Sequence, residues 1–330
     1  MSDLLNHYFC AVDTLKVIPK SIRENIDKSL FFLGSQGADI FFYYNILPFK
    51  EAVSYGSIIH NERIDKLFYN FLKYTQKEKD EVRRHKLYSY LLGFTCHHAL
   101  DTNTHPFIIN RSGNYNKEDS DTEIYKHMHK KYEVLLDVAL LKYRYNIQAN
   151  KYKVKPIFTL SNDDYIILDD LFKYLLEETY NLVVADQYVT KKAIKSEGNI
   201  LSLLINPNIC ESALLKIIRK LTSNNGYIST AIYPDSTDID FILNLNNDTW
   251  CHPCYENKKY NFSYVELFEE GIENTCNRII KIDKIKDNNF TLDDINEIYN
   301  DLSYETGLPW KDKSEQKYFD INYINRLREF

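Results

Sequence analysis

The chain has 330 residues, of which 44% are hydrophobic and 27% charged, and its formal net charge is −6 at pH 7. A chain of this length can bury a sizeable core, and the composition is typical of a folded globular protein rather than a disordered one. The acidic balance argues against nucleic-acid partners held by charge, because such proteins gather basic residues on one face to neutralise phosphates.

The first residues, MSDLLNHYFCAVDTLKVIPK, lack the basic segment, unbroken apolar stretch and small-residue cleavage site of a signal peptide. No window approaches the ~20 apolar residues of a membrane-spanning helix. The six cysteines are scattered through the chain, which suits free thiols in a reducing compartment. We therefore expect a cytoplasmic protein without a transmembrane segment.

Only 9 glycines and 8 prolines interrupt the chain, so we expect few turns and long helices. Apolar residues recur at i, i+3, i+4 and i+7, the period of an amphipathic helix. Ser21 with Glu24, and Thr291 with Asp294, have the spacing of helix N-terminal caps. The sequence therefore predicts an all-α protein built as a multi-helix bundle. The helical segments are residues 21–34, 62–76, 85–101, 121–145, 163–194, 208–223, 263–285 and 291–302.

The segment KYKVKP, residues 151–156, is the most plausible boundary between two regions. Eight of the nine histidines lie in residues 1–150, and only His252 lies beyond them. We therefore expect a metal-binding helical domain in residues 1–150. Residues 151–330 are expected to form a C-terminal helical region packed on it, without an assigned function. Within that region, residues 227–250 have a weak helical period, and we interpret them as irregular.

Two histidine–carboxylate pairs stand out in the first region. His97 and Asp101 are four residues apart in GFTCHHALDTNTHPFI, so on a helix they lie one turn apart on the same face. His129 and Glu133 repeat this spacing in the next long helix, and the two pairs would face each other across antiparallel neighbours. His105 precedes a proline, which disfavours helical conformation at the residue before it. We therefore expect the helix to end there, with His105 projecting from a turn.

Further candidate ligands lie upstream. Asp39 follows two glycines in GSQGADIFFYYN, which let the backbone turn sharply. His60 ends GSIIH before another helix, and His7 lies in the first helix. This mixture of imidazoles and carboxylates suits zinc, and it is large enough for more than one ion. The complete candidate set is His7, Asp39, His60, His97, Asp101, His105, His129 and Glu133.

Less specific explanations exist for each residue alone. A lone helical histidine is usually a surface or satisfied core residue, and a single i, i+4 pair often only stabilises its helix. The combination of two pairs with a His-Pro step favours metal binding. His98 points away from His97 and is interpreted as a supporting or surface residue. His127 is interpreted as a solvated or supporting residue, and His85 as a solvated helix position. CHPC, residues 251–254, is weak evidence for a structural zinc without a second such pair.

The stretches GSQGADIFFYYN, GSIIH, HHALDTNTHPF and HMHKKYEVLLD occur in this order. With them the first half of the chain resembles the bacterial zinc-dependent phospholipases C, within the phospholipase C/P1 nuclease superfamily. The resemblance implies an all-helical fold that holds a cluster of three zinc ions in a cleft. It also implies that Asp39 is the candidate general base.

The resemblance further implies a distribution of ligands over the ions. Asp39, His60, His97 and Asp101 would share one zinc, with Asp101 bridging to another. His105, His129 and Glu133 would hold a second zinc, and His7 would lie at the third. Secreted members complete the third site with an N-terminal tryptophan, which this chain lacks near its start. Two arrangements therefore stay open: three ions, or two ions with His7 joining them.

The expected function is that of a zinc-dependent phosphodiesterase of phospholipase C type. Metal-activated water would attack a phospholipid or a small soluble phosphoester between glycerol and phosphate, and a phospholipid substrate would entail a transient contact with the membrane surface. Two alternatives stay open. One is a P1-type single-strand nuclease, for which the many tyrosines offer stacking surfaces. The other is a non-catalytic, metal-stabilised helical interaction protein.

Overall fold

The computed structural model describes residues 4–44, 55–207, 211 and 227–330. Within these ranges the regular secondary structure is helical apart from one two-stranded antiparallel hairpin. The predicted all-α class is therefore confirmed. None of the described helices is long and apolar enough to cross a membrane.

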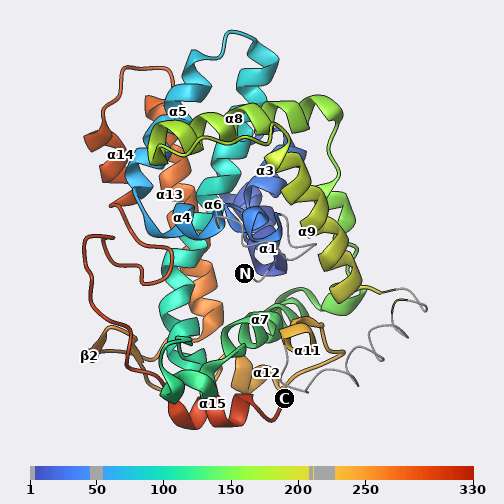
Figure 1. The fold of residues 1–330 in the computed structure, drawn as a ribbon, viewed down its shortest axis with the longest axis vertical. Helices are drawn as coiled ribbons and strands as arrows, with labels where there is room; N and C mark the ends of the chain where they lie inside the picture. Colours follow the sequence, from blue (N-terminus) through green and yellow to red (C-terminus); the bar gives the residue numbers. More distant parts are fainter. Residues whose placement is uncertain (1–3, 45–54, 208–210, 212–226) are drawn as a thin grey trace.

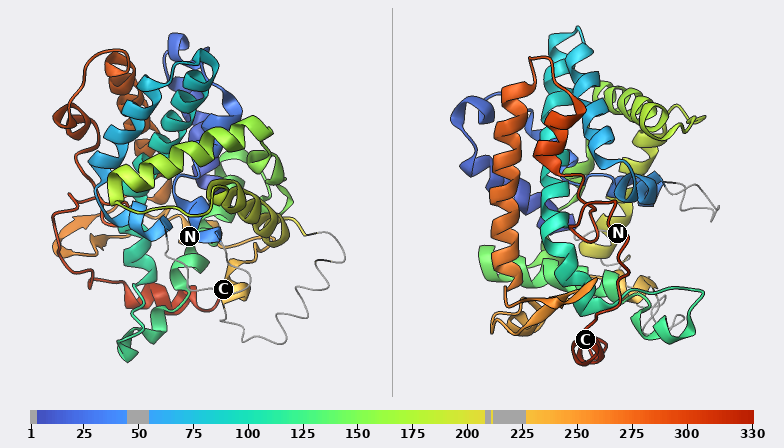
Figure 2. Two further views of the ribbon diagram at one scale, coloured as in Figure 1. Left: turned by 45° about the horizontal axis from the view of Figure 1, so that its top comes forward. Right: turned by 90° about the vertical axis from the view of Figure 1, so that its left-hand side faces the viewer.

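A long helix, α6 (Glu81–Ser112), runs through the middle of the molecule and lies beside α13 (Tyr264–Ile285) (Figures 1 and 2). Asp80 caps α6, because its carboxylate accepts hydrogen bonds from the amides of Val82 and Arg83. A short helix, α3 (Lys28–Gly34), crosses α6 closely at a pair of glycines. A Cβ on Gly93 would lie 2.1 Å from the carbonyl oxygen of Phe31, so the crossing requires glycine.

The remaining helices surround this centre. The first helix, α1 (Leu4–Val17), packs on α6, α7 (Met128–Tyr145) and α13. Helix α8 (Asn162–Tyr180) packs on α5 (Ile64–Lys77) and α9 (Val189–Ile205) (Figure 1). The other elements are α2 (Lys20–Arg23), η1 (Asp39–Tyr43), α4 (Tyr55–Asn61), η2 (Ser120–Tyr125), η3 (Ala149–Lys151), η4 (Lys155–Phe158), α11 (Tyr227–Ala231), α12 (Ile239–Ile242), β1 (Trp250–His252), β2 (Tyr255–Tyr260), α14 (Leu292–Tyr299) and α15 (Ile321–Leu327), where η marks a 3-10 helix.

The expectation that the helix ends before Pro106 is wrong. Helix α6 continues through Pro106 to Ser112. Proline lacks the amide that would bond to the carbonyl of Thr102. The segment around Gly307 packs against this carbonyl so closely that a Cβ on Gly307 would lie 2.4 Å from its oxygen. His105 therefore lies within the helix rather than on a turn.

Several helix boundaries also differ from the expectation. The segment 121–145 divides into η2 and α7, and 163–194 divides into α8 and α9. The segment 21–34 divides into α2 and α3, and Ser21 lies inside α2 instead of capping it. Thr291 and Asp294 do form the predicted capping box of α14. Almost all of the predicted helix 208–223 lies outside the described residues.

The C-terminal half is closely associated with the first half. One hydrophobic core takes residues from both sides of residue 150, including Phe94 from α6 and Phe172 from α8. The division into two regions stays a prediction. Residues 227–250, expected to be irregular, contain the short helices α11 and α12 and end at β1. The CHPC sequence lies in the β1–β2 hairpin, where Cys251 and Cys254 are free thiols.

Candidate metal centre

One face of α6 carries three of the candidate ligands. His97, Asp101 and His105 follow each other at intervals of four residues, so the continuous helix aligns them. His97 Nε2 lies 3.2 Å from Asp101 Oδ2, and His105 Nδ1 lies 3.9 Å from Asp101 Oδ1. The proline inside the helix thus leaves His105 in line with the other two.

Helix α1 brings His7 to this face. Asp137 on α7 fixes the start of α1, because its carboxylate accepts hydrogen bonds from the amides of Leu5 and Asn6. His7 Nε2 lies 3.1 Å from Asp101 Oδ1, and His7 Nδ1 lies 3.2 Å from His97 Nδ1. Asp101 therefore touches imidazoles from two helices.

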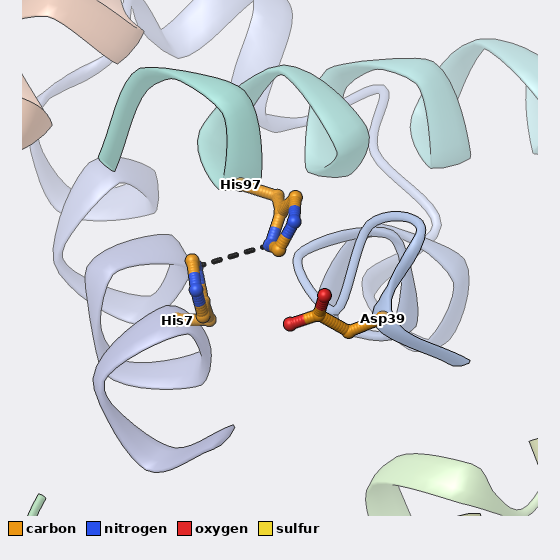
Figure 3. Close-up of side chains that lie close together, drawn as sticks. All are labelled: His7, Asp39 and His97. Carbon is orange, nitrogen blue, oxygen red and sulfur yellow. Dashed lines mark hydrogen bonds between the residues drawn. The ribbon is translucent and has the colours of Figure 1, made fainter. Parts of the chain in front are cut away.

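A tight turn places Asp39 at the start of η1. Gly37 has a φ of +56°, in the left-handed region that favours glycine. Asp39 then points toward the space between His7 and His97 (Figure 3). Its Oδ1 lies 3.1 Å from Nε2 of His60, which comes from the last turn of α4.

The first turns of α7 supply the remaining pair. His129 Nε2 lies 2.9 Å from Glu133 Oε1, and His105 Nε2 lies 3.7 Å from the same oxygen. Glu133 is buried, while the side chain of His129 is 35% exposed. On one side this pair therefore faces the ligands of helix α6, and on the other side it faces solvent.

Backbone carbonyls orient two of the imidazoles. His60 Nδ1 donates to the carbonyl of Gly56 at 2.7 Å, and His105 Nδ1 donates to the carbonyl of Tyr304 at 2.8 Å. In both residues this bond fixes the tautomer and leaves Nε2 free to bind a metal, as is usual for metal-ligating histidines. Glu133 Oε2 is buried without a hydrogen-bond partner in the described part of the chain. These residues fit zinc.

The donors form three groups, in each of which the ligand atoms lie within 4.8 Å of one another. Imidazole with carboxylate is a usual donor set for zinc. Two of the groups share His97, and the third adjoins them where His105 Nδ1 lies 3.9 Å from Asp101 Oδ1. They are His7 with Asp39 and His97, His60 with His97 and Asp101, and His105 with His129 and Glu133.

Burial and mutual charge set the protonation of the metal-free centre. Burial alone raises the pKa of Asp39, but His97 and His60 lower it well below its usual value. Glu133 likewise has a pKa well below its usual value, because neighbouring positive groups, His129 among them, outweigh its burial. Burial lowers the pKa of His105, but Asp101 and Glu133 outweigh it and raise that pKa to about 10. Burial lowers the pKa of His97 to about 4. The carboxylates are therefore ionised, and His105 carries a proton that a metal must displace.

A cavity of about 320 Å³ opens onto this centre. Its wall includes Asp39 and His60 as well as His105, His129 and Glu133. His7, His97 and Asp101 lie deeper and do not line it. The other lining residues are Phe42, Ser57, Asn61, Ile109, Gly113, Asn114, Tyr115, Tyr125, His127, Glu305 and Gln316.

The other candidate histidines lie apart from the three groups. His98 is completely buried rather than at the surface, and its Nε2 donates to the carbonyl of Leu302 at 2.9 Å. Its Nδ1 accepts from Arg278 of α13 at 2.6 Å. His127 is half-buried on the cavity wall, and His85 is exposed, as expected.

No sequence pattern indicates the part that Tyr304 plays. Its ring centroid lies 4.7 Å from that of His60 and 5.7 Å from that of His97, and its carbonyl orients His105. Glu305 and Gln316 from the same C-terminal segment line the cavity. None of these residues lies in a recognisable motif, because their position depends on how the segment after α14 folds back over α6.

The sequence model of one protein family, described as zinc dependent phospholipase C, matches residues 6–188. The match covers more than half of the chain and includes all eight candidate ligands. It extends beyond the boundary expected near residue 150, through α8. No curated protein and no solved structure matches the chain.

Proposed function

The chain belongs to the zinc-dependent phospholipase C family, and we propose that it hydrolyses phosphodiesters, with a phospholipid cleaved between glycerol and phosphate as its substrate. The observation that supports this best is the convergence of three zinc-type donor groups beside one open cavity. Ions held close together can clamp a phosphodiester and stabilise its leaving group. A scaffold that needed zinc only for folding would have no need of a cavity at the ligands.

We assign the ligands to ions as the family resemblance implies. Asp39, His60, His97 and Asp101 would hold one zinc, and Asp101 would also be a ligand at a second position. His105, His129 and Glu133 would hold another zinc, and His7 would lie at the third. The contacts of Asp101 with both His7 and His97 support the bridging role.

The residues of the chain divide the chemistry between them. Bound zinc supplies Lewis-acid polarisation of the phosphoryl oxygens and an activated water at neutral pH. Asp39 is ionised and lies on the cavity wall, so it accepts the proton of the attacking water as general base. The carbonyls of Gly56 and Tyr304 hold His60 and His105 in position throughout.

The cavity wall supports the proposed substrate class. An acidic protein can bind a phosphate group there because bound cations invert the local charge. Phe42, Tyr115 and Tyr125 offer apolar and aromatic surface next to the ligands. A phospholipid would reach this cavity through a transient contact between the protein and the membrane surface.

Three substrates test the proposal: a chromogenic phosphocholine diester, phosphatidylcholine vesicles and single-stranded DNA, each with the zinc content measured in parallel. We expect hydrolysis of the ester and of the lipid, and its loss in Asp39→Asn. The control is Asp186→Asn, which removes a carboxylate outside the cavity. Less than one zinc per chain in the purified protein, with no phosphodiester hydrolysis, would overturn the proposal.

The same experiment decides between the alternatives. The aromatic side chains of the cavity wall could stack on bases, so cleavage of DNA alone would identify a single-strand nuclease. Zinc binding that stabilises the fold without any hydrolysis would instead identify a metal-stabilised interaction protein.

A further inference from the structure

Glu197 is a buried carboxylate that lies outside the ligand set described above. It is 0% exposed, and neither of its oxygens has a hydrogen-bond partner among the residues that the structure describes. A buried charge is strongly unfavourable unless a counter-charge or a metal ion partners it. An unsatisfied carboxylate in a native fold therefore needs an explanation, and an ion that binds there is one.

The packing of α9 holds Glu197 toward the interior. Glu197 shares the buried face of the helix with Ile194 and Leu201, three residues before it and four after it. On the next residue, Gly198, a Cβ would lie 2.6 Å from Cβ of Phe158 in η4. The helix is thus fitted closely to its neighbour, and it also packs against η1, which begins with Asp39.

The charged groups around Glu197 include ligands of the metal centre and Lys130. Burial and the charge of Asp39 raise the pKa of Glu197 well above its usual value, while Lys130 and His7 oppose that rise. Neither Lys130 nor His7 gives Glu197 a hydrogen bond. In the metal-free chain the raised pKa keeps a proton on Glu197 beside the ionised Asp39. A cation near both side chains would displace that proton and give the buried carboxylate the partner that it lacks.

We propose that Glu197 is a ligand of a zinc ion held together with His7 and Asp39. Their group with His97 offers three donors, and a fourth ligand would complete the usual coordination of zinc. Glu197 is not among the donors already within 4.8 Å, so binding is expected to draw its side chain toward the ion. The proposal rests on the zinc centre of the proposed function but not on its substrate. It also extends the centre beyond the segment that matches the family, which ends at residue 188.

Glu197→Gln in the full chain tests this ligand, because glutamine keeps the size and removes the charge. The readout is zinc per chain by elemental analysis after dialysis against a zinc buffer, together with zinc retained against increasing chelator. We expect the variant to lose one zinc ion per chain, or to release it at an at least ~10-fold lower chelator concentration. In crystals of the wild type, zinc anomalous scattering should place an ion about 2.0–2.2 Å from a Glu197 oxygen.

Asp169→Asn is the matched control. Asp169 is also a buried carboxylate next to α9, but it accepts hydrogen bonds from the amides of Thr190 and Lys191. This variant should lose stability and keep its zinc. If Glu197→Gln fails to fold, Glu197→Asp is measured in the same way, and this variant should bind the same ion more weakly.

The outcomes separate this proposal from the proposed function. Wild-type zinc content and chelator resistance in the folded Glu197 variant would overturn the assignment of Glu197 as a ligand, whatever the activity. Absence of phosphodiester hydrolysis, with zinc lost in Glu197→Gln but not in Asp169→Asn, would overturn only the proposed activity. A wild type that binds no zinc would overturn both.

Discussion

The imidazole ring of His97 lies where any side chain at position 37 would place its Cβ. A Cβ on Gly37 would be 2.0 Å from Cδ2 of His97, well inside the contact distance of two carbon atoms. Gly37 also has a positive φ that other residues adopt only with strain. The turn that positions Asp39 and the helix that carries His97 are therefore fitted to each other at this point.

Gly37→Ala is expected to damage the centre and the fold together. The backbone strain alone costs roughly 1–3 kcal/mol, and the clash pushes His97 away from His60 and Asp101. We expect a lower free energy of unfolding in urea and a zinc content reduced by at least one ion per chain.

Gly113→Ala separates strain from ligand displacement. Gly113 also has a positive φ, but its Cβ would meet the ring of Tyr125 rather than a ligand. This variant should lose stability and keep its zinc. Equal zinc loss in the two glycine variants would contradict the role assigned to the contact with His97.

Asp101→Asn should remove more zinc than a change at the edge of the centre. The carboxylate of Asp101 lies within 3.2 Å of both His7 and His97 and within 3.9 Å of His105. Its negative charge is therefore close to three of the candidate imidazole ligands. His129→Gln alters only the group with His105 and Glu133. Elemental analysis should show a loss of more than one ion in the first variant and of at most one in the second. Equal losses would argue against a bridging carboxylate.

The metal-free protein should become less stable as the pH rises through the alkaline range. His105 has a pKa raised from 6.5 to about 10 in the folded chain, so its contribution to stability is complete below pH 6.5 and is lost as the pH rises through about 10. One such group changes the free energy of unfolding by up to ~1.4 kcal/mol per pH unit. Asp39 and Glu133, whose pKa values are lowered, contribute above their ordinary values and lose their effect in acid.

Urea unfolding of the chelated protein between pH 5 and 10 measures this dependence, and His105→Gln is the comparison. The variant should lack the decline above pH 6.5. Zinc affinity should change in the opposite direction and increase with pH, because the metal displaces the proton of His105. A wild-type stability that stays level from pH 6.5 to 10 would contradict the proton placed on His105.

His98→Leu should destabilise the fold and leave the zinc content unchanged. The substitution removes the acceptor that Arg278 uses and leaves its buried guanidinium without that bond. The cost should be roughly 2–3 kcal/mol, as for a buried charged group that loses a partner. His97→Leu, one residue earlier, should instead lose zinc. A loss of zinc in His98→Leu that matched that of His97→Leu would show that His98 takes part in the centre.

The sequence by itself determined the local parts of this protein. The 3.6-residue period predicted the helices, and the four-residue spacing of His97 with Asp101 and of His129 with Glu133 placed each pair on one helical face. The same logic predicted the cap formed by Thr291 and Asp294. All of these relationships join residues within about one turn, where helix geometry alone fixes the contacts.

Only the tertiary structure decided how the parts meet. Helix α6 continues through Pro106, where the segment around Gly307 packs on the carbonyl of Thr102, and His105 therefore stays in line with Asp101. The carbonyl of Tyr304, 199 positions away in the chain, orients that same histidine, and Arg278 donates a hydrogen bond to His98, which lies outside the metal groups. Such contacts leave no periodic signal, because they depend on how distant segments pack rather than on spacing along the chain.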